Sequence, residues 1–304
     1  MKGEAEEAGH FFRKLKMAFL DCFDREFGNK SGAFFMRNKL LAALLGLTLG
    51  TSAYAVSVSL LKGDGFRDDL GYREDKTTMT IENFSMWELG TVFFYYDITE
   101  PTTDDNGTQA HGAYSNQFFG GISTTASFSK MTGKDYSYGA LKDVSLRLEI
   151  ENGSGNGANN FQNYFYGLQY DIAVPGFDFV SLNTVLRDNP NNRGVGFQIG
   201  GFWQMTWDYG RWNRYKFTGF FAASPWDGDQ DRSEQSGFAL ENYPFTSKGQ
   251  YLTTQPQFLY DLGYGLWGKQ NRLEVGLEYA YFLNRFQLQN RDEKVLQYMV
   301  KISY

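Results

Sequence analysis

The end of the chain alternates strictly between apolar and polar side chains. From Leu296 to Tyr304, one face of an extended strand carries Leu, Tyr, Val, Ile and Tyr, and the other carries Gln, Met, Lys and Ser. Successive side chains of a strand point to opposite faces. An apolar face that ends on an aromatic residue is typical of the closing strand of an outer-membrane β-barrel. The last strand of a soluble β-sandwich alternates in the same way, so this pattern leaves both folds open.

The N-terminal region favours export and, with it, the membrane barrel. Residues 36–39 form a short basic head, residues 40–50 are apolar, and Ala53-Tyr54-Ala55 is a small-x-small cleavage pattern. The apolar stretch is too short to span a bilayer as a helix. We therefore predict a secretory signal peptide at 36–55 and a mature chain that begins at Val56.

Residues 1–35 mix acidic and basic side chains with aromatic ones, and a secretory signal should not follow such a segment. We expect them to be an upstream extension from a mis-assigned start, which the cell does not translate. A short regulatory helix is the alternative.

The composition after residue 55 excludes several classes of protein. Removing 55 residues from 304 leaves 249, and the only cysteine, Cys22, is removed with them, so a lipid anchor on cysteine is excluded. The remaining 21 basic (29 − 8) and 29 acidic (35 − 6) residues give a net charge of −8, which leaves no basic footprint for nucleic acid. No later segment is apolar for long enough to form a membrane helix.

Alternating segments continue through residues 56–304 and predict about twelve strands. The expected strands are 56–62, 77–86, 89–98, 116–130, 138–150, 161–172, 178–187, 195–207, 214–223, 248–260, 271–284 and 293–304. Short connections alternate with long ones, as the periplasmic turns and external loops of bacterial barrels do. We therefore predict an all-β protein, a transmembrane antiparallel β-barrel in the bacterial outer membrane. Its surroundings would be outer-membrane lipid, lipopolysaccharide and the barrel-assembly machinery. Pro256 lies inside a predicted strand, where it implies a bulge or a missing hydrogen bond.

Two segments also carry a family resemblance. Residues 131–139, Met-Thr-Gly-Lys-Asp-Tyr-Ser-Tyr-Gly, resemble the Leu-Thr-Gly-Lys-Asp-Leu-Ser-Phe-Gly turn of the nucleoside-specific channel-forming outer-membrane proteins, the Tsx-like family that includes OmpK. Residues 92–97, after a turn with Trp87, are similar to that family's Phe-Tyr-Gly-Tyr-x-Asp strand. The chain departs from the family at Phe94, where the family has Gly, and near Thr91, where an acidic residue is missing. The resemblance implies a barrel that conducts nucleosides.

If the apolar side chains of each strand face lipid, the side chains between them face the interior of the barrel. The inward residues that we expect to line a solute channel are Glu82, Phe84, Phe93, Tyr95, Asp97, Arg147, Glu149, Phe165, Asp171, Arg187, Arg272, Glu274 and Glu278. Over all the inward positions, seven carboxylates stand against six basic groups, which indicates no strong ion preference. Aromatic faces can stack a base, and carboxylate and guanidinium groups can bind a sugar. Phe93, Tyr95 and Asp97 match the family strand. Alternatively, inward charges only pair with one another and inward rings only fill space.

Other patterns point to weaker candidate functions. Residues 263–268 spell the dinucleotide-binding string, but they fall in a predicted turn between strands. Asp227–Asp231 begin like a calcium loop, yet Arg232 replaces the required Gly. A barrel hydrolase would need a positioned base, and His111 lies in a polar loop. We predict no enzyme activity, no metal and no cofactor. A general porin, or a surface receptor for phage or bacteriocin, is the alternative function.

The predicted signal peptide can be tested by expressing the gene in a Gram-negative host. The protein recovered from outer-membrane fractions should begin at Val56 and should migrate differently on a gel before and after heating, as folded barrels do. Intact-mass measurement and terminal sequencing check the start. Recovery of the mature chain as a soluble periplasmic protein would contradict the architecture.

Overall fold

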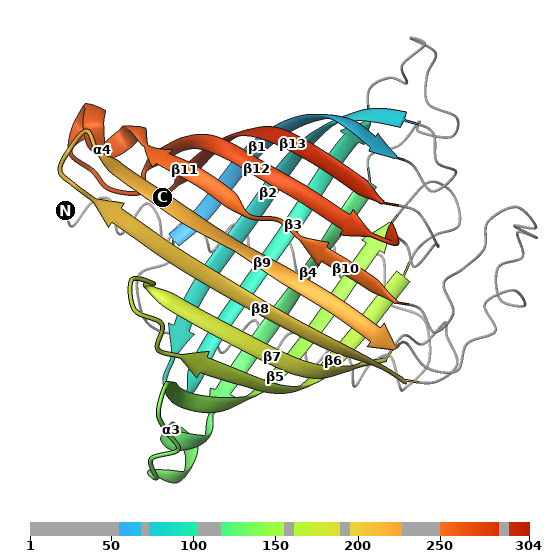
Figure 1. The fold of residues 1–304 in the computed structure, drawn as a ribbon, viewed down its shortest axis with the longest axis vertical. Helices are drawn as coiled ribbons and strands as arrows, with labels where there is room; N and C mark the ends of the chain where they lie inside the picture. The colour runs from blue at the N-terminus through green and yellow to red at the C-terminus, as the bar shows by residue number, and fades with distance from the viewer. Residues whose placement is uncertain are drawn as a thin grey trace, which may run out of the picture. The chain divides into compact units, whose positions relative to one another are not determined.

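One closed antiparallel sheet accounts for every strand that the computed structural model describes (Figure 1). The described residues are 55–67, 73–101, 117–154, 161–188, 195–226, 250–285 and 292–304. The strands are β1 (Ala55–Arg67), β2 (Arg73–Trp87), β3 (Gly90–Pro101), β4 (Gln117–Ser127), β5 (Leu141–Ser154), β6 (Phe161–Ile172), β7 (Phe179–Asp188), β8 (Val195–Asp208), β9 (Arg214–Trp226), β10 (Tyr251–Thr254), β11 (Gln257–Asp261), β12 (Leu273–Leu283) and β13 (Glu293–Ser303). The predicted extension at 1–35, most of the signal peptide, His111 and the candidate calcium loop lie outside these residues.

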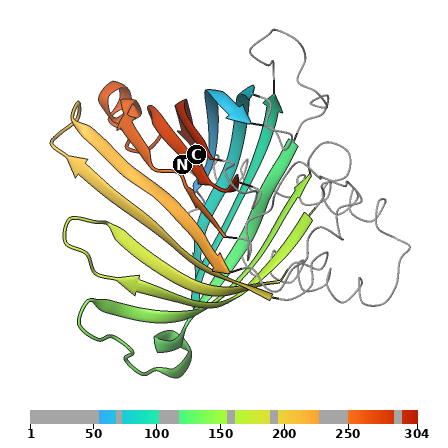
Figure 2. The same cartoon turned by 45° about the vertical axis from the view of Figure 1, so that its right-hand side comes forward.

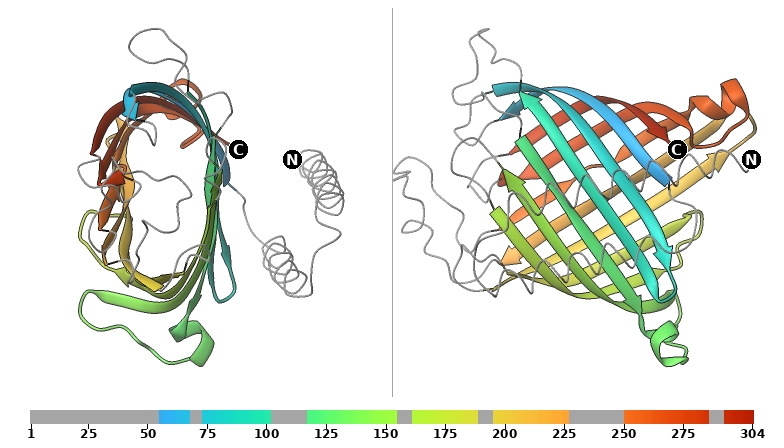
Figure 3. Two further views of the ribbon diagram at one scale, coloured as in Figure 1. Left: turned by 90° about the vertical axis from the view of Figure 1, so that its right-hand side faces the viewer. Right: turned by 180° about the vertical axis from the view of Figure 1, so that it is seen from behind.

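The sheet closes because β1 pairs with β13 as well as with β2. Ser57 lies opposite Ser303, Gly63 lies opposite Gln297, and the Tyr304 N–H donates to the Val56 carbonyl at 3.0 Å. Figure 3 (left) looks into the resulting ring of strands. Closure leaves each described strand paired on both sides, as a bilayer requires of its spanning strands. The predicted fold class, an antiparallel β-barrel of about twelve strands, is confirmed.

Pro256 accounts for the difference between twelve strands and thirteen segments. Both β10 and β11 lie between β9 and β12. Thr254 is opposite Tyr281, and Gln257 is opposite Glu278. Between these two pairs, both the β10–β11 segment and β12 advance by three residues, so neither strand contains a bulge. The Pro256 carbonyl still accepts from the Tyr279 N–H at 2.9 Å, but proline has no N–H to return the bond. The conflict predicted at Pro256 is therefore a missing hydrogen bond.

Apart from Gln255–Pro256 between β10 and β11, the described connections lie at one end of the barrel (Figure 2), where the C-terminus also lies (Figure 1). β2 and β3 are joined by a two-residue turn, Glu88–Leu89. Gly90 follows this turn where only glycine fits, because a Cβ there would lie 1.9 Å from the Thr125 carbonyl oxygen. The strands leave the opposite end through segments that fall almost entirely outside the described residues. Most of the residues in the long loops predicted at 99–115, 151–160, 188–193, 224–247 and 285–292 lie outside the described ranges. Where these loops are described, the strands run further than predicted, since β3 extends to Pro101, β5 to Ser154 and β9 to Trp226.

The turn that carries the family-like motif contains a short helix, α3 (Phe128–Thr132). The strands predicted at 116–130 and 138–150 are therefore too long at this end, since β4 stops at Ser127 and β5 starts at Leu141. Ser127 caps α3 by accepting from the Lys130 N–H at 3.1 Å and also donates to Asp143. Within the motif, the Ser137 N–H donates to Asp135 at 2.7 Å and holds the pKa of that exposed carboxyl below its ordinary value.

A second short helix, α4 (Leu262–Trp267), joins β11 to β12. It occupies most of the dinucleotide-binding string instead of following it. Asp261 caps α4 by accepting from the Tyr264 N–H at 2.9 Å, and Gly268 ends the helix with φ 68°. Residues 263–268 therefore form most of a short helix with a cap at each end, not a dinucleotide-binding loop. Neither described helix is long and apolar enough to cross a membrane.

The strands separate apolar and polar side chains between the outer and inner faces. On β13, Leu296 is 52% exposed and Tyr298 is 72% exposed, whereas their neighbours Gln297 and Met299 are 3% and 4% exposed. This is the alternation predicted for the end of the chain. An outward apolar face can lie against lipid hydrocarbon, where a polar one would be unfavourable.

Tyr304 lies on the outer face at the end of this strand and is 71% exposed. Tyr304→Asp should impair assembly of the barrel, because it places a charge on the lipid side of the closing strand. The cost in folding free energy should be small, about 1 kcal/mol or less, since the position is near the interface. The measurement is the fraction of heat-modifiable protein in outer-membrane fractions, with Tyr304→Phe as the control. Normal insertion of Tyr304→Asp would count against this register.

Candidate functional site

The inner face of the barrel is identified by contacts between strands that are not neighbours. The ammonium of Lys216 on β9 lies 2.6 Å from Glu274 on β12. The guanidinium of Arg147 on β5 lies 5.0 Å from the centre of the Phe202 ring on β8. Since other strands separate each pair within the sheet, these contacts run through the interior. Residues directly opposite in the register share this face.

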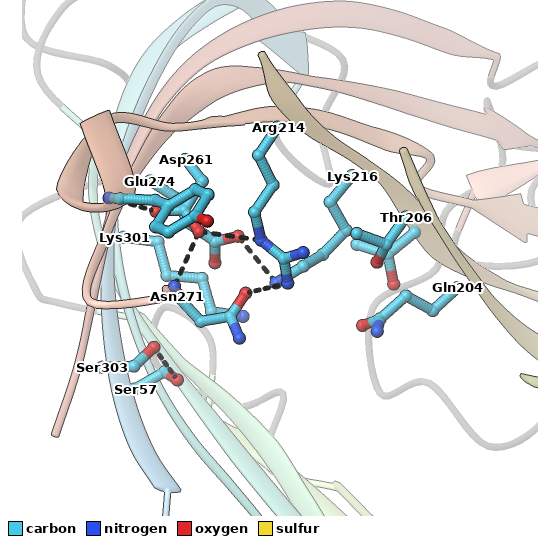
Figure 4. A network of polar contacts seen from close by, with 12 residues as sticks. Ser57, Gln204, Thr206, Arg214, Lys216, Asp261, Asn271, Glu274, Lys301 and Ser303 are labelled. Atoms are coloured by element: carbon cyan, nitrogen blue, oxygen red, sulfur yellow. Dashed lines mark hydrogen bonds and ion pairs between the residues drawn. The ribbon is translucent and has the colours of Figure 1, made fainter. Parts of the chain in front are cut away.

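A polar network occupies the interior near the turn end (Figure 4). Arg214 at the start of β9 lies 3.1 Å from Asp261 and 3.2 Å from Asp208, and it donates to the Asn271 side chain at 3.2 Å. Asp261 also accepts from the Asn271 N–H at 2.7 Å. These bonds tie the ends of β8, β9 and β11 to the turn before β12.

Ion pairs continue this network around the wall. Lys301 on β13 pairs with Glu82 on β2 across β1, and Ser57 and Ser303 share a hydrogen bond of 2.8 Å beside them. The side chains of Glu82 and Lys301 remain 26% and 14% exposed. Because these inward groups still contact solvent, water reaches this part of the interior.

A second network centres on Arg147. This guanidinium lies 2.5 Å from Glu149 and donates to Gln169 at 2.9 Å. Gln169 then donates to Asp171 at 3.2 Å, and Asp171 also accepts from Ser181 at 2.6 Å. Three neighbouring strands, β5, β6 and β7, are therefore linked on their inner faces.

Four aromatic side chains form a continuous row on the inner face, which we call the aromatic strip: Phe93, Tyr95, Phe119 and Phe161. The rings of Phe93 and Tyr95 are stacked with centroids 5.8 Å apart, Tyr95 lies 5.7 Å from Phe119, and Phe119 lies 6.0 Å from Phe161. Gly121 lies opposite Tyr95 on β4, so no side chain stands between Tyr95 and Glu151 at this position. The strip thus spans β3, β4 and β6.

Carboxylates border the aromatic strip. Tyr95 donates its hydroxyl to Glu151 at 3.2 Å, and Asp97 accepts from Thr80 at 2.6 Å. On β2, Phe84 is opposite Phe93 and Glu82 is opposite Tyr95. Rings and hydrogen-bond acceptors therefore lie side by side on the inner faces of β2 and β3.

Glu278 on β12 is surrounded by three glutamine side chains. Gln257 and Gln297 each donate to it at 2.7 Å, and Gln255 donates at 3.3 Å. The two glutamines on either side of Pro256 both point inwards, because they are two residues apart in a continuous register.

The remaining predicted residues occupy other parts of the wall. Phe165 on β6 is buried between Glu149 and Arg187 in the register. Arg187 lies 5.6 Å from the centre of the Tyr251 ring and donates to Asn163 at 3.5 Å. Arg272 lies at the rim just before β12, is exposed, and donates to the Ser303 carbonyl at 3.1 Å. The structure thus joins most of the predicted residues in networks but leaves Arg272 at the rim.

Asp261 and Phe161 are among the interior residues that were missed from the sequence. Asp261 was assigned to a turn, although an Asp just before a short helix is a common N-cap. Phe161 has the same strand parity as Phe165, so alternation along β6 alone would have placed it on the inner face. The helix-cap pattern would have identified Asp261, and the strand alternation would have identified Phe161.

Among known proteins, the chain is similar only at the level of solved β-barrel structures. No family model matches the chain, and no curated protein matches it. The KdgM porin structure is 11% identical with a TM-score of 0.41 and covers 82% of this chain and 99% of its own. The translocator domain of the autotransporter NalP from Neisseria meningitidis is 11% identical with a TM-score of 0.38, covering 90% of this chain and 95% of its own. These values assign neither a family nor a cargo.

The class of the protein follows from its own geometry. It is a closed antiparallel barrel with an apolar outer face and a charged, hydrogen-bonded interior, which is the architecture of bacterial outer-membrane barrels. The protein is an outer-membrane β-barrel.

The Arg147 network generates a stability prediction. Arg147→Met should lower the free energy of unfolding by about 3 kcal/mol, because Glu149 would keep a largely buried charge without its partner. Urea unfolding in detergent micelles provides the measurement. A double change, Arg147→Met with Glu149→Leu, should recover part of the loss, since it removes both charges. Lys142→Met, at an exposed position of the same strand, should change stability by less than about 0.5 kcal/mol. Equal effects of Arg147→Met and Lys142→Met would contradict the network.

Proposed function

We propose that the protein is an outer-membrane channel for the diffusion of nucleosides or similar small neutral solutes. The observation that carries this proposal is the aromatic strip with carboxylates along its border. Stacking of a base on an aromatic side chain contributes about 1 to 3 kcal/mol. A carboxylate such as that of Asp97 can accept a hydrogen bond from a sugar hydroxyl, and charged hydrogen bonds are the stronger ones.

The size of the barrel supports contact with a small solute. Eight-stranded barrels are filled by their own side chains, and sixteen-stranded porins leave a wide aqueous channel. Twelve strands lie between these cases, so a solute in the interior should touch the wall. The resemblance of residues 131–139 and 92–97 to the Tsx-like family supports nucleosides as the first solutes to test.

The alternatives concern the same barrel. A general porin would conduct ions and small solutes without regard to the aromatic strip. A surface receptor for phage or bacteriocin would use the external loops, and a barrel hydrolase would use inward carboxylates as acid and base. The aromatic strip favours the solute channel, because neither a receptor nor a hydrolase needs a row of rings along the inner wall.

Conductance of the purified protein in a planar bilayer tests the proposal. Adenosine or uridine should partly block the ion current in a concentration-dependent way, whereas free ribose should not, because it lacks the flat ring. Conductance without any nucleoside-dependent block would favour the general porin. Absence of conductance would favour the receptor.

Substitutions in one segment of β3 locate the contact. Phe93→Ala and Tyr95→Ala should weaken the nucleoside block by about 1 to 3 kcal/mol, if the stacking is direct. Phe94→Ala and Tyr96→Ala are matched controls, since these side chains lie on the outer face, and they should leave the block nearly unchanged. The measurement is the nucleoside concentration that gives half-maximal block for each variant.

The contrast between neighbours is the informative part of this test. A register error of one residue would exchange the two faces and would reverse the result. Equal effects at all four positions would contradict a direct role of the aromatic strip.

A further inference from the structure

The ion pairs of the structure change the balance of charge that the sequence indicates. Counted by residue type, the interior has almost equal numbers of acidic and basic groups. In the structure, four inward bases lie in ion pairs: Arg147 with Glu149, Arg214 with Asp261 and Asp208, Lys216 with Glu274, and Lys301 with Glu82. Asp208 and Asp261 add acidic partners that the sequence count left out. Asp97, Glu151, Asp171 and Glu278 have no ion pair among the described residues.

Glu278 is the most enclosed of these carboxylates, and it is 6% exposed. Its hydrogen bonds come from neutral amides of Gln255, Gln257 and Gln297. These donors are neutral and supply no counter-charge. A buried charge without a counter-charge is unfavourable, so a cation nearby would be stabilised.

Gln297 supplies a second and independent observation. Its side chain is 3% exposed and donates through Nε2 to Glu278. With Nε2 engaged in this way, the Oε1 atom of the same amide has no hydrogen-bond partner in the described part of the chain. A buried acceptor without a donor is also unfavourable. Glu278 therefore lacks a positively charged partner, and Oε1 of Gln297 on the adjacent strand lacks a donor.

The charges around Glu278 act in the same direction. Asp97 and Glu82 lie on the inner faces of β3 and β2, and Lys301 is already paired with Glu82. The other inward base on this part of the wall, Lys76, lies with its ammonium 5.4 Å from the centre of the Phe66 ring. Three carboxylates against two ammonium groups leave this wall with a net negative charge.

We propose that the interior conducts monovalent cations in preference to anions, and that Glu278 together with Oε1 of Gln297 is the point at which K⁺ binds on its way through. Oxygen ligands suit such a cation, and acidic side chains in a narrow passage select cations. Two oxygen ligands bind weakly enough for the ion to leave again, as conduction requires. This inference rests on the channel part of the proposed function but not on nucleosides as the cargo.

The test is the reversal potential of the reconstituted protein under a KCl gradient across a planar bilayer. The unmodified protein should give a K⁺ to Cl⁻ permeability ratio above unity. Glu278→Gln should lose most of this preference, so that the ratio falls towards unity. Gln297→Met, which keeps the carboxylate and removes the amide oxygen, should give an intermediate ratio.

Two further variants serve as controls. Glu278→Asp keeps the charge and should keep the selectivity, which separates the charge from a general effect on folding. Asp135→Asn removes an exposed carboxylate from the turn after α3 and should leave the ratio unchanged. Heat-modifiable migration confirms that each variant is folded.

The outcomes separate this inference from the proposed cargo. Glu278→Gln should leave the nucleoside block nearly unchanged, and Phe93→Ala should leave the permeability ratio nearly unchanged. A ratio at or below unity in the unmodified protein, or the same ratio in Glu278→Gln, would overturn the proposed cation site. A missing nucleoside block with an intact K⁺ preference would overturn only the nucleoside proposal.

Discussion

The pairing of β1 with β13 is the constraint on which the rest of the structure depends. Inside a bilayer no water is present to bond a free N–H or carbonyl group, and each unsatisfied group costs several kcal/mol. The register from Ser57 opposite Ser303 to Gly63 opposite Gln297 removes the last two edges of the sheet. One exception is tolerated at Pro256, where the bond that proline cannot donate is lost but the register on both sides is kept.

Closure also fixes which side chains meet inside the barrel. Because side chains alternate along every strand, the ring of registers determines one inner set and one outer set for the whole chain. Lys301 therefore meets Glu82, and Lys216 meets Glu274, across an intervening strand. Polar groups that would be unfavourable against lipid satisfy one another in the interior, and the water that reaches Glu82 lowers the cost of their charge.

Alternation allowed much of this to be predicted from the sequence. The strand positions, the outer face of β13 and the inner faces of β3, β5 and β12 follow from period two alone. Helices α3 and α4 could not be found in this way, because Ser127 and Asp261 act through local caps that interrupt the alternation. The partners of the inward charges also could not be found, since a pair such as Arg147 with Gln169 depends on the register between strands. For that reason, the nearly equal numbers of inward acidic and basic residues did not reveal that Glu278 has no ion-pair partner.

The interior consequently has two walls of different chemistry. On β3, β4 and β6 the aromatic strip offers flat apolar surfaces with acceptors beside them, which suits a neutral ring-bearing solute. On β2, β3, β12 and β13 the net charge is negative, which suits a cation. Asp97 belongs to both walls, because it follows Tyr95 on the inner face of β3 and accepts a hydrogen bond from Thr80 on β2 at 2.6 Å.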